Sequence, residues 1–345
     1  MRITERQKQA VMLGAVSAGA LMMARAMRGR ERYDFRGKSV LITGGSRGLG
    51  LVLARDLAAE GARLTLVARD EADLDRAASD VRSRHADAEV VTATADVRKR
   101  YEAERAIAQA VERYGGIDVL VNNAGIIQVG PIDHMKLGDY EDAMNTHFWG
   151  PLYMILAALP HMRRQGGGRI VNISSIGGKI AIPHLVPYSA SKFALTGLSD
   201  GLRAELMRDN IVVTTVCPGL MRTGSPVNAL FKGKRPQEYA WFAISDSLPL
   251  ASINAERAAR QIVNACRHGD AELVITVQAK LAVIARNIAP EFVSDALALM
   301  NRLLPGPAGA SGDDARPGRQ SESEWAPSAL TATTYAAAEK NNELG

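Results

Sequence analysis

Seven short runs of apolar, mostly β-branched residues recur along the chain, and longer amphipathic stretches separate them. The runs lie at residues 40–42, 64–67, 90–92, 119–121, 170–173, 212–216 and 273–275. Short strands that alternate with longer helices are typical of βαβ units, in which the strands pair in parallel. The sequence therefore predicts an α/β fold built on one doubly wound parallel sheet.

Composition and charge limit what such a chain does. Of its 345 residues, 47% are hydrophobic, which is enough for a large core. Residues 1–38 hold nine Lys or Arg against three Asp or Glu, so the rest of the chain, with 33 basic and 34 acidic residues, is nearly neutral. A nearly neutral body lacks the basic surface that binding to nucleic-acid phosphates needs. We therefore expect no nucleic-acid partner.

The N-terminal segment, residues 1–35, contains an uncharged run from Ala10 to Ala24 between basic flanks. As a helix this run would be about 22 Å long, shorter than the ~30 Å hydrocarbon core of a bilayer. Four interpretations stay open: a cleaved signal peptide, a membrane anchor or interfacial helix, a helix packed on protein, and a disordered segment. If the segment is an anchor, the arginines that follow it predict a domain that faces the cytoplasm.

A glycine-rich turn follows the first predicted strand directly and opens a helix. The turn contains Gly44, Ser46, Arg47, Gly48, Leu49 and Gly50. Gly44, Gly48 and Gly50 permit a tight turn and let backbone N–H groups approach a diphosphate at the start of the helix. The placement between strand and helix predicts a dinucleotide site of the Rossmann type, here with the spacing G-x-x-x-G-x-G.

Charge near this turn favours NADP over NAD as the cofactor. NAD-binding domains usually carry an acidic residue at the end of the second strand, which binds the ribose 2′-hydroxyl. That position is Ala68 in this chain, Arg69 follows it, and the turn itself contains Arg47. Two guanidinium groups without a carboxylate suit a 2′-phosphate, so we expect NADP.

Three further motifs follow in order: Asn122-Asn123-Ala124-Gly125, Ser174-Ser175 and Tyr188-x-x-x-Lys192. Together with the glycine-rich turn, they make residues 36–275 strongly resemble the short-chain dehydrogenase/reductase family, in its Tyr-x-x-x-Lys branch. The resemblance implies an oxidoreductase in which Tyr188 and Lys192 also contact the nicotinamide cofactor. It implies further cofactor contacts from Asp96, Val97, Asn123, Ala124, Gly125 and Thr223.

The chemistry of the tyrosine and the lysine also follows from the residues themselves. Carbonyl reduction needs an acid that protonates the oxygen, and the reverse reaction needs a base at the same place. Tyr188 and Lys192 are four residues apart on a predicted helix, so they share one face, and we expect the ammonium to lower the pKa of the phenol. Family members place the substrate-orienting serine thirteen residues before the tyrosine. That residue is Ser175 here, whereas Ser174 is expected to face the interior.

One position departs from the family pattern. The fourth catalytic member of the family is an asparagine that holds a water in a proton relay, and its position is occupied by His147 in this chain. Two interpretations stay open: His147 relays a proton itself, or it is a packing residue that leaves the relay to water. The candidate catalytic residues are therefore Ser175, Tyr188, Lys192 and His147.

The resemblance also implies a substrate lid over 224–250, within a catalytic domain predicted over 36–277. The lid contains Leu230, Phe231, Tyr239, Trp241, Phe242 and Ile244. These side chains either line an apolar substrate site or pack the lid on the core. Residues 278–304 predict amphipathic helices interrupted at Pro290, and residues 305–345 predict a disordered tail.

The spacing of histidines and cysteines predicts no metal site. We expect His134, His161, His184 and His268 to be surface or loop residues. We expect Cys217 to be a small buried side chain rather than a reactive thiol.

These observations predict an NADP-dependent enzyme that interconverts a secondary alcohol and a carbonyl on an apolar substrate of steroid, lipid or terpenoid type. The alternative is a non-catalytic dinucleotide-binding sensor or scaffold. The expected partners are the apolar small molecule and further copies of the chain in a homo-oligomer, with membrane contact through 10–24 as the open alternative above. The expected location is cytoplasmic.

Overall fold

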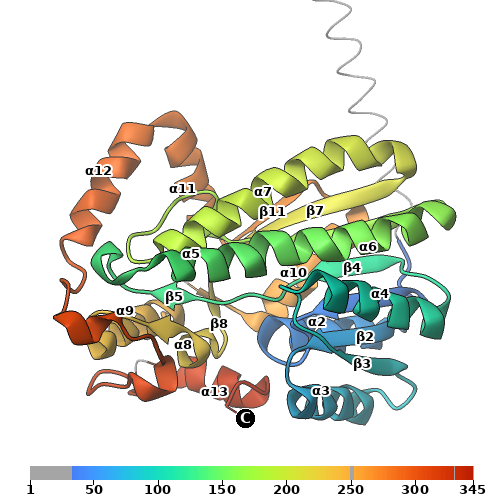
Figure 1. Cartoon of the computed structure of the whole chain (residues 1–345), viewed down its shortest axis with the longest axis horizontal. Coiled ribbons are helices and arrows are strands. Elements are labelled where there is room, and N and C mark those ends of the chain that lie inside the picture. The colour runs from blue at the N-terminus through green and yellow to red at the C-terminus, as the bar shows by residue number, and fades with distance from the viewer. Residues whose placement is uncertain (1–32, 249–251, 330, 345) are drawn as a thin grey trace, which may run out of the picture.

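The computed structural model describes residues 33–248, 252–329 and 331–344, so the N-terminal run 10–24 lies outside the described residues. The seven predicted strands pair in one parallel sheet, in the order β11-β7-β6-β4-β1-β2-β3 (Figure 1). They are β1 (Ser39–Thr43), β2 (Arg63–Ala68), β3 (Val90–Thr94), β4 (Val119–Asn122), β6 (Gly168–Ile173), β7 (Ile211–Pro218) and β11 (Glu272–Ile275). The predicted doubly wound sheet is confirmed, with its switch point between β1 and β4.

Helices cover both faces of the sheet, because alternate residues of a strand point to opposite faces. In β1, Val40 and Ile42 pack into one core, and Leu41 packs into the other. The first core is closed by α2 (Gly48–Ala59), α3 (Glu71–Arg84) and α10 (Ala255–His268), and the second by α4 (Arg100–Tyr114), α6 (Gly150–Arg164) and the end of α7 (Val186–Leu206).

A single π-helical turn interrupts the helical segment that leads into α6. Helix α5 (Leu137–Met144) continues into η2 (Asn145–Trp149), and α6 follows without a break. A π turn inserts one extra residue and rotates the side chains that follow it, and such turns are frequent at functional sites. His147 lies in the middle of η2.

The predicted lid is a separate layer beside the carboxyl ends of the strands. It contains α8 (Ser225–Asn228), β9 (Leu230–Phe231) and α9 (Arg235–Ser247). Short pairings fix it to the domain, since β9 pairs with β5 (Gln128–Val129), and β8 (Leu220–Arg222), just before the lid, pairs with β10 (Ser252–Asn254).

Two helices follow β11, the last strand of the large sheet, and form a hairpin at one end of the molecule (Figure 1). They are α11 (Val277–Ile288) and α12 (Pro290–Asn301), and Pro290 opens the second helix, where its missing N–H costs no hydrogen bond. Ile288 and Phe292 are 78% and 71% exposed, so one apolar face of the hairpin has no cover among the described residues. No helix among residues 33–248, 252–329 and 331–344 is long and apolar enough to cross a membrane.

The C-terminal residues contradict the predicted disordered tail. Within the part that the structure describes, β12 (Arg316–Pro317) pairs antiparallel with β9, and α13 (Ala332–Lys340) packs on α9. The order comes from contacts with distant parts of the chain, which local composition does not encode.

His134 shows how the tail is held, and its predicted surface position is wrong. The tail covers the ring, which is 5% exposed. Its Nε2 accepts a hydrogen bond from the Ala308 N–H at 2.9 Å, and its Nδ1 lies 2.8 Å from the Asp313 carboxylate.

Removing the His134 ring should therefore loosen the tail. We expect His134→Ala to lower the free energy of unfolding by about 1–3 kcal/mol, since two buried hydrogen bonds are lost. Hydrogen exchange should rise in residues 308–314. The exposed His268 gives the matched control, His268→Ala. Unchanged exchange in 308–314 would show that the contact does not hold the tail.

Candidate active site

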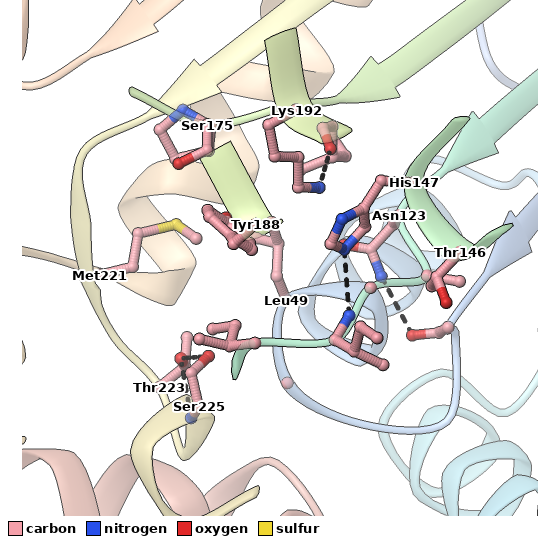
Figure 2. A pocket seen from close by; sticks show the side chains of 18 of the residues that line it. Leu49, Asn123, Thr146, His147, Ser175, Tyr188, Lys192, Met221, Thr223 and Ser225 are labelled. Carbon is pink, nitrogen blue, oxygen red and sulfur yellow. Dashed lines mark hydrogen bonds between the residues drawn. The ribbon is translucent and has the colours of Figure 1, made fainter. Parts of the chain in front are cut away.

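The predicted site residues line one cavity of about 960 Å³ at the carboxyl ends of the strands. This edge of an open parallel sheet is where ligands bind in doubly wound folds. Gly50 is the exception among the predicted residues, because it lies behind the glycine-rich turn. Figure 2 shows Ser175, Tyr188 and Lys192 on one side of the cavity and Thr223 across from them.

The glycine-rich turn has the geometry that a diphosphate needs. Gly44 and Gly48 have φ values of +63° and +55°, which favour glycine. A Cβ on Gly50 would lie 2.0 Å from the Gly44 carbonyl oxygen, so this position excludes any side chain. Helix α2 begins at Gly48 without a side-chain cap and without an acidic residue in its first turn. Its first N–H groups therefore suit a negatively charged ligand, and the residues fit a dinucleotide.

Asn123 follows β4, the strand that pairs directly with β1, and it holds this turn in place. Its side-chain amide donates to the carbonyl oxygens of Thr43 and Gly44, both at 3.1 Å. Its backbone N–H donates to the Thr43 hydroxyl at 3.0 Å. The side chain thus braces the turn.

Ser175, Tyr188 and Lys192 meet as the motif spacing predicts. Tyr188 and Lys192 lie one turn apart near the start of α7, and the Lys192 Nζ is 5.6 Å from the centre of the tyrosine ring. The side chains of Ser175 and Tyr188 lie close together, because both come within 3.4 Å of the point where a Cβ of Gly177 would be. The lysine also donates to the Ile173 carbonyl oxygen at 2.8 Å, which fixes its ammonium below the ring.

Burial sets the protonation of both groups. It raises the pKa of Tyr188 to about 12, although the Ser175 side chain opposes the rise, and it lowers the pKa of Lys192 to about 7. The expectation that Lys192 lowers the pKa of Tyr188 is not met, because burial disfavours both charged forms. Tyr188 therefore keeps its proton at neutral pH.

The two adjacent serines have different surroundings. The Ser174 hydroxyl is buried, donates to the Lys192 carbonyl oxygen at 3.0 Å and lies 2.9 Å from the Thr196 hydroxyl. The Ser175 side chain lines the cavity and accepts a hydrogen bond from the Gly177 N–H at 3.0 Å. The Ser174 hydroxyl is thus engaged inside the protein, and Ser175 is the better placed of the two to orient a substrate, as the spacing predicts.

Comparison with known proteins agrees with this geometry. A family model for short chain dehydrogenase matches residues 38–230. SadH of Mycobacterium tuberculosis, named as an oxidoreductase, is 38% identical over 259 residues, which cover 73% of this chain and 91% of SadH. The chain belongs to the short-chain dehydrogenase family. It is thus an oxidoreductase with a nicotinamide dinucleotide as cofactor.

Other members of the family carry reductase names. Ketoacyl reductase HetN of Nostoc is 37% identical over 193 residues, covering 56% of this chain and 67% of HetN. L-sorbose reductase of Gluconobacter frateurii, solved with NADPH and L-sorbose, aligns with a TM-score of 0.63 at 26% identity, over 70% of this chain and 97% of that one.

His147 replaces the family's asparagine and has both ring nitrogens occupied. The Ile126 N–H donates to its Nε2 at 3.1 Å, so the ring proton is on Nδ1, which lies 2.7 Å from the Ser191 hydroxyl. That hydroxyl donates in turn to the Tyr188 carbonyl oxygen at 2.8 Å. Burial, with a contribution from the charge of Lys192, lowers the pKa of His147 well below its usual value. Of the two open interpretations, the geometry favours packing over a proton relay.

Arginines surround the adenosine end of the cavity. Arg69 is exposed at the end of β2, and Arg47 donates to the Asn228 side chain at 3.2 Å. Sequence reasoning missed Arg98, which follows the predicted Asp96-Val97 pair, lines the same cavity and pairs with Asp96 at 2.7 Å. Burial alone would raise the pKa of Asp96, but the hydrogen bonds and charge of Arg98 outweigh it and lower that pKa.

The apolar residues of the lid divide between core and cavity. Phe231 and Tyr239 are fully buried and pack together in the lid's own core, whereas Trp241 and Phe242 line the cavity. Sequence reasoning missed three other groups that line it: Asp246 on α9, and Leu297 and Met300 on α12. An amphipathic pattern does not show which face of α12 meets the cavity.

His184, predicted as a surface or loop residue, lies in a turn but is buried. It is 6% exposed, and its Nδ1 lies 2.9 Å from the Glu238 carboxylate, which also accepts from the Trp241 ring N–H at 2.7 Å. The ring is not on the surface because the lid covers it. Cys217 is buried, as predicted, and burial raises the pKa of its thiol to about 12.

The role of His147 is testable through the pH dependence of turnover. The His147 imidazole is neutral and hydrogen-bonded at both nitrogens, so it does not change its protonation near neutral pH. His147→Asn should therefore keep the shape of the kcat–pH profile between pH 6 and 8. It should also lower the free energy of unfolding by about 1–3 kcal/mol, as should Ser191→Ala in the same chain of hydrogen bonds. Loss of an inflection that the wild type shows in this range would instead identify His147 as a proton relay.

Proposed function

We propose that the protein is an NADP(H)-dependent oxidoreductase that interconverts a secondary alcohol and a carbonyl on an apolar substrate. One observation carries the proposal: the neighbouring side chains of Ser175 and Tyr188, with Lys192 one helical turn away, face a cavity that is also lined by the glycine-rich turn and the apolar lid.

In this proposal each group of the chain has one task. A bound nicotinamide supplies or accepts the hydride. The Ser175 hydroxyl donates a hydrogen bond to the substrate oxygen and orients it. The Tyr188 hydroxyl gives its proton to that oxygen in reduction and takes it back in oxidation. Lys192, fixed by the Ile173 carbonyl oxygen, would hold the nicotinamide cofactor beside Tyr188.

The high pKa of Tyr188 supports the reductive direction. A phenol that keeps its proton through neutral pH is a ready acid, whereas oxidation needs the phenolate. The acid is lost only as the pH rises toward the pKa of about 12.

The choice of NADP rests on the charges at the adenosine end. Arg47, Arg69 and Arg98 all line that end of the cavity, and the position of the usual NAD-selecting carboxylate is Ala68. The Asp70 side chain that follows is engaged, because it accepts the Asp73 N–H at 2.8 Å and caps α3. The NADPH bound to the related L-sorbose reductase gives further support.

The proposal of an apolar substrate is based on the residues that line the cavity between Tyr188 and the lid. Ile182, Leu185, Trp241 and Phe242 line this part of the cavity. Asp246 is the polar exception, and burial raises its pKa to about 8, so at neutral pH it is an uncharged hydrogen-bonding group. A largely apolar wall with a few polar groups suits an apolar carbonyl compound.

Tyr188→Phe tests the catalytic role directly. Without its proton donor the enzyme should lose turnover by about 10²- to 10⁴-fold while it still binds NADPH. Steady-state NADPH oxidation and a fluorescence titration of NADPH measure the two properties. Tyr153→Phe, at a partly buried tyrosine of α6 that does not line the cavity, is the matched control and should leave turnover unchanged. Full turnover in Tyr188→Phe would refute the role.

Arg69→Asp tests the choice of cofactor. The change removes a 2′-phosphate partner and adds a repelling carboxylate, so NADPH should bind about 10- to 100-fold more weakly, with little effect on NADH. Arg286→Asp on α11 makes the same change of net charge far from the adenosine end. A wild-type enzyme that binds NADH more tightly than NADPH would contradict the proposal.

We also propose that the uncharged run 10–24 holds the enzyme at a membrane, with the catalytic domain facing the cytoplasm. The exposed apolar face of the α11–α12 hairpin supports this location. Full-length protein should sediment with membranes, and a variant that begins at Arg32 should do so less. If both are fully soluble and equally active, the run is not an anchor.

A further inference from the structure

The last residues of the chain lie on the glycine-rich turn. We call residues 341–344, which follow α13, the C-terminal strap. The Gly48 N–H donates to the Asn341 carbonyl oxygen at 2.9 Å, and the Asn342 side chain donates to the Ser46 carbonyl oxygen at 2.9 Å. The strap thus occupies a backbone donor at the N-terminus of α2.

Glu343 extends from the strap into the cavity. Its carboxylate accepts the Gly224 N–H at 2.6 Å, and its Oε1 lies 3.0 Å from the point where a Cβ of Gly48 would be. The residue is 7% exposed, and it lines the same cavity as Tyr188 and Lys192. A carboxyl group therefore bridges the turn and the segment after Thr223.

This bridge lies where a bound dinucleotide has its diphosphate. In Rossmann-type folds the diphosphate binds at the N-terminus of the helix after the first strand, against the glycine-rich turn. Here that helix is α2, and its Gly48 N–H already has a partner in the strap. An anionic oxygen of Glu343 and a phosphate oxygen cannot occupy the same space beside Gly48.

The strap is held firmly from outside the cavity. The Arg55 guanidinium donates to the Asn341 side chain at 2.7 Å and to the Lys340 carbonyl oxygen at 2.9 Å. The Asn228 side chain donates to the Glu343 carbonyl oxygen at 3.0 Å. These contacts fix the backbone of the strap and thereby hold the Glu343 side chain in the cavity.

Burial disfavours the charged form of the Glu343 carboxyl. It raises the pKa of the carboxyl to about 7, against the opposing effects of the Gly224 N–H and the charge of Arg47. The nearby Asp246 carboxyl faces the same region, and Glu343 contributes to its raised pKa. A group held at such a cost is readily displaced by a dinucleotide, whose diphosphate is permanently charged.

We propose that the C-terminal strap is an autoinhibitory contact, in which Glu343 occupies the diphosphate site of the free enzyme and leaves when the dinucleotide binds. The proposal rests on the family's use of a nicotinamide dinucleotide. It is independent of the choice between NAD and NADP and of the substrate.

Release of the strap also reaches the substrate lid. Helix α13 leads into the strap and packs on α9, where the Thr334 hydroxyl lies 2.6 Å from that of Ser247 and the hydroxyls of Tyr335 and Tyr239 meet. Displacement of Glu343 therefore pulls on the helix that carries Trp241 and Phe242. Cofactor entry and lid position are linked through one short helix.

The test uses the full chain and measures cofactor binding without turnover. Glu343→Ala removes the carboxyl from the cavity, and Asn341→Ala releases the strap at Arg55, outside the diphosphate site. Both variants should bind NADPH and NADH on the order of tenfold more tightly than the wild type, because the free enzyme no longer has to give up the strap. Glu339→Ala, an exposed carboxyl on α13, is the matched control and should bind like the wild type.

Hydrogen exchange supplies the second readout. Saturating dinucleotide should increase exchange in the wild-type peptide that covers residues 339–344. Decreased exchange there would overturn the proposal, since the strap would then close over the cofactor. Weaker or unchanged dinucleotide binding in Glu343→Ala and Asn341→Ala would also overturn it, since the strap would then not compete with the cofactor. If neither dinucleotide binds any form of the protein, the proposed function as a dinucleotide-dependent enzyme is refuted, and the strap proposal is refuted with it.

Discussion

The free N–H groups at the start of α2 are the constraint on which the site depends. A helix leaves its first N–H groups without partners, and Arg47, at the capping position, supplies no side-chain acceptor. The glycines at 44, 48 and 50 keep these groups open to the cavity, because they carry no side chains; at 44 and 50 a Cβ would also clash with backbone atoms. An anion or a carbonyl oxygen from elsewhere must therefore bind them. In the free chain, the C-terminal strap meets this requirement.

Burial governs the chemistry on the other side of the cavity. The same low-dielectric surroundings keep the proton on Tyr188 and weaken the positive charge of Lys192. His147 adds no charge, because it is buried and neutral, and it fixes the start of α7 through Ser191 and the Tyr188 carbonyl oxygen. The π turn η2 directs the His147 ring toward this contact, and the ring lies edge-on to Tyr188 at 5.4 Å. A structural hydrogen-bond network thus takes the place of the family's asparagine.

The sequence predicted what local pattern determines. Strand runs, the glycine-rich turn and the Tyr188/Lys192 spacing are short-range signals, and the seven-stranded sheet and the shared cavity follow from them. The tail was mispredicted because its order comes from contacts such as Arg55 with Asn341, which are 286 positions apart. The same cause hid the burial of His134 and His184, since each is covered by a segment distant in the chain. The pKa values of Tyr188 and Lys192 depend on how deeply the fold buries them, which spacing alone does not give.

The central claim is that the nicotinamide and Tyr188 act together on one carbonyl group, with hydride transfer at the carbon and proton transfer at the oxygen. Its most direct measurement follows deuterium from the C4 position of labelled NADPH during reaction with a panel of apolar ketones. We expect at least one ketone to be reduced, with one deuterium on the carbinol carbon of the product. NADPH that binds but is oxidised by no carbonyl, together with NADP that is reduced by no apolar alcohol, would contradict the assignment and leave a dinucleotide-binding protein without this reaction.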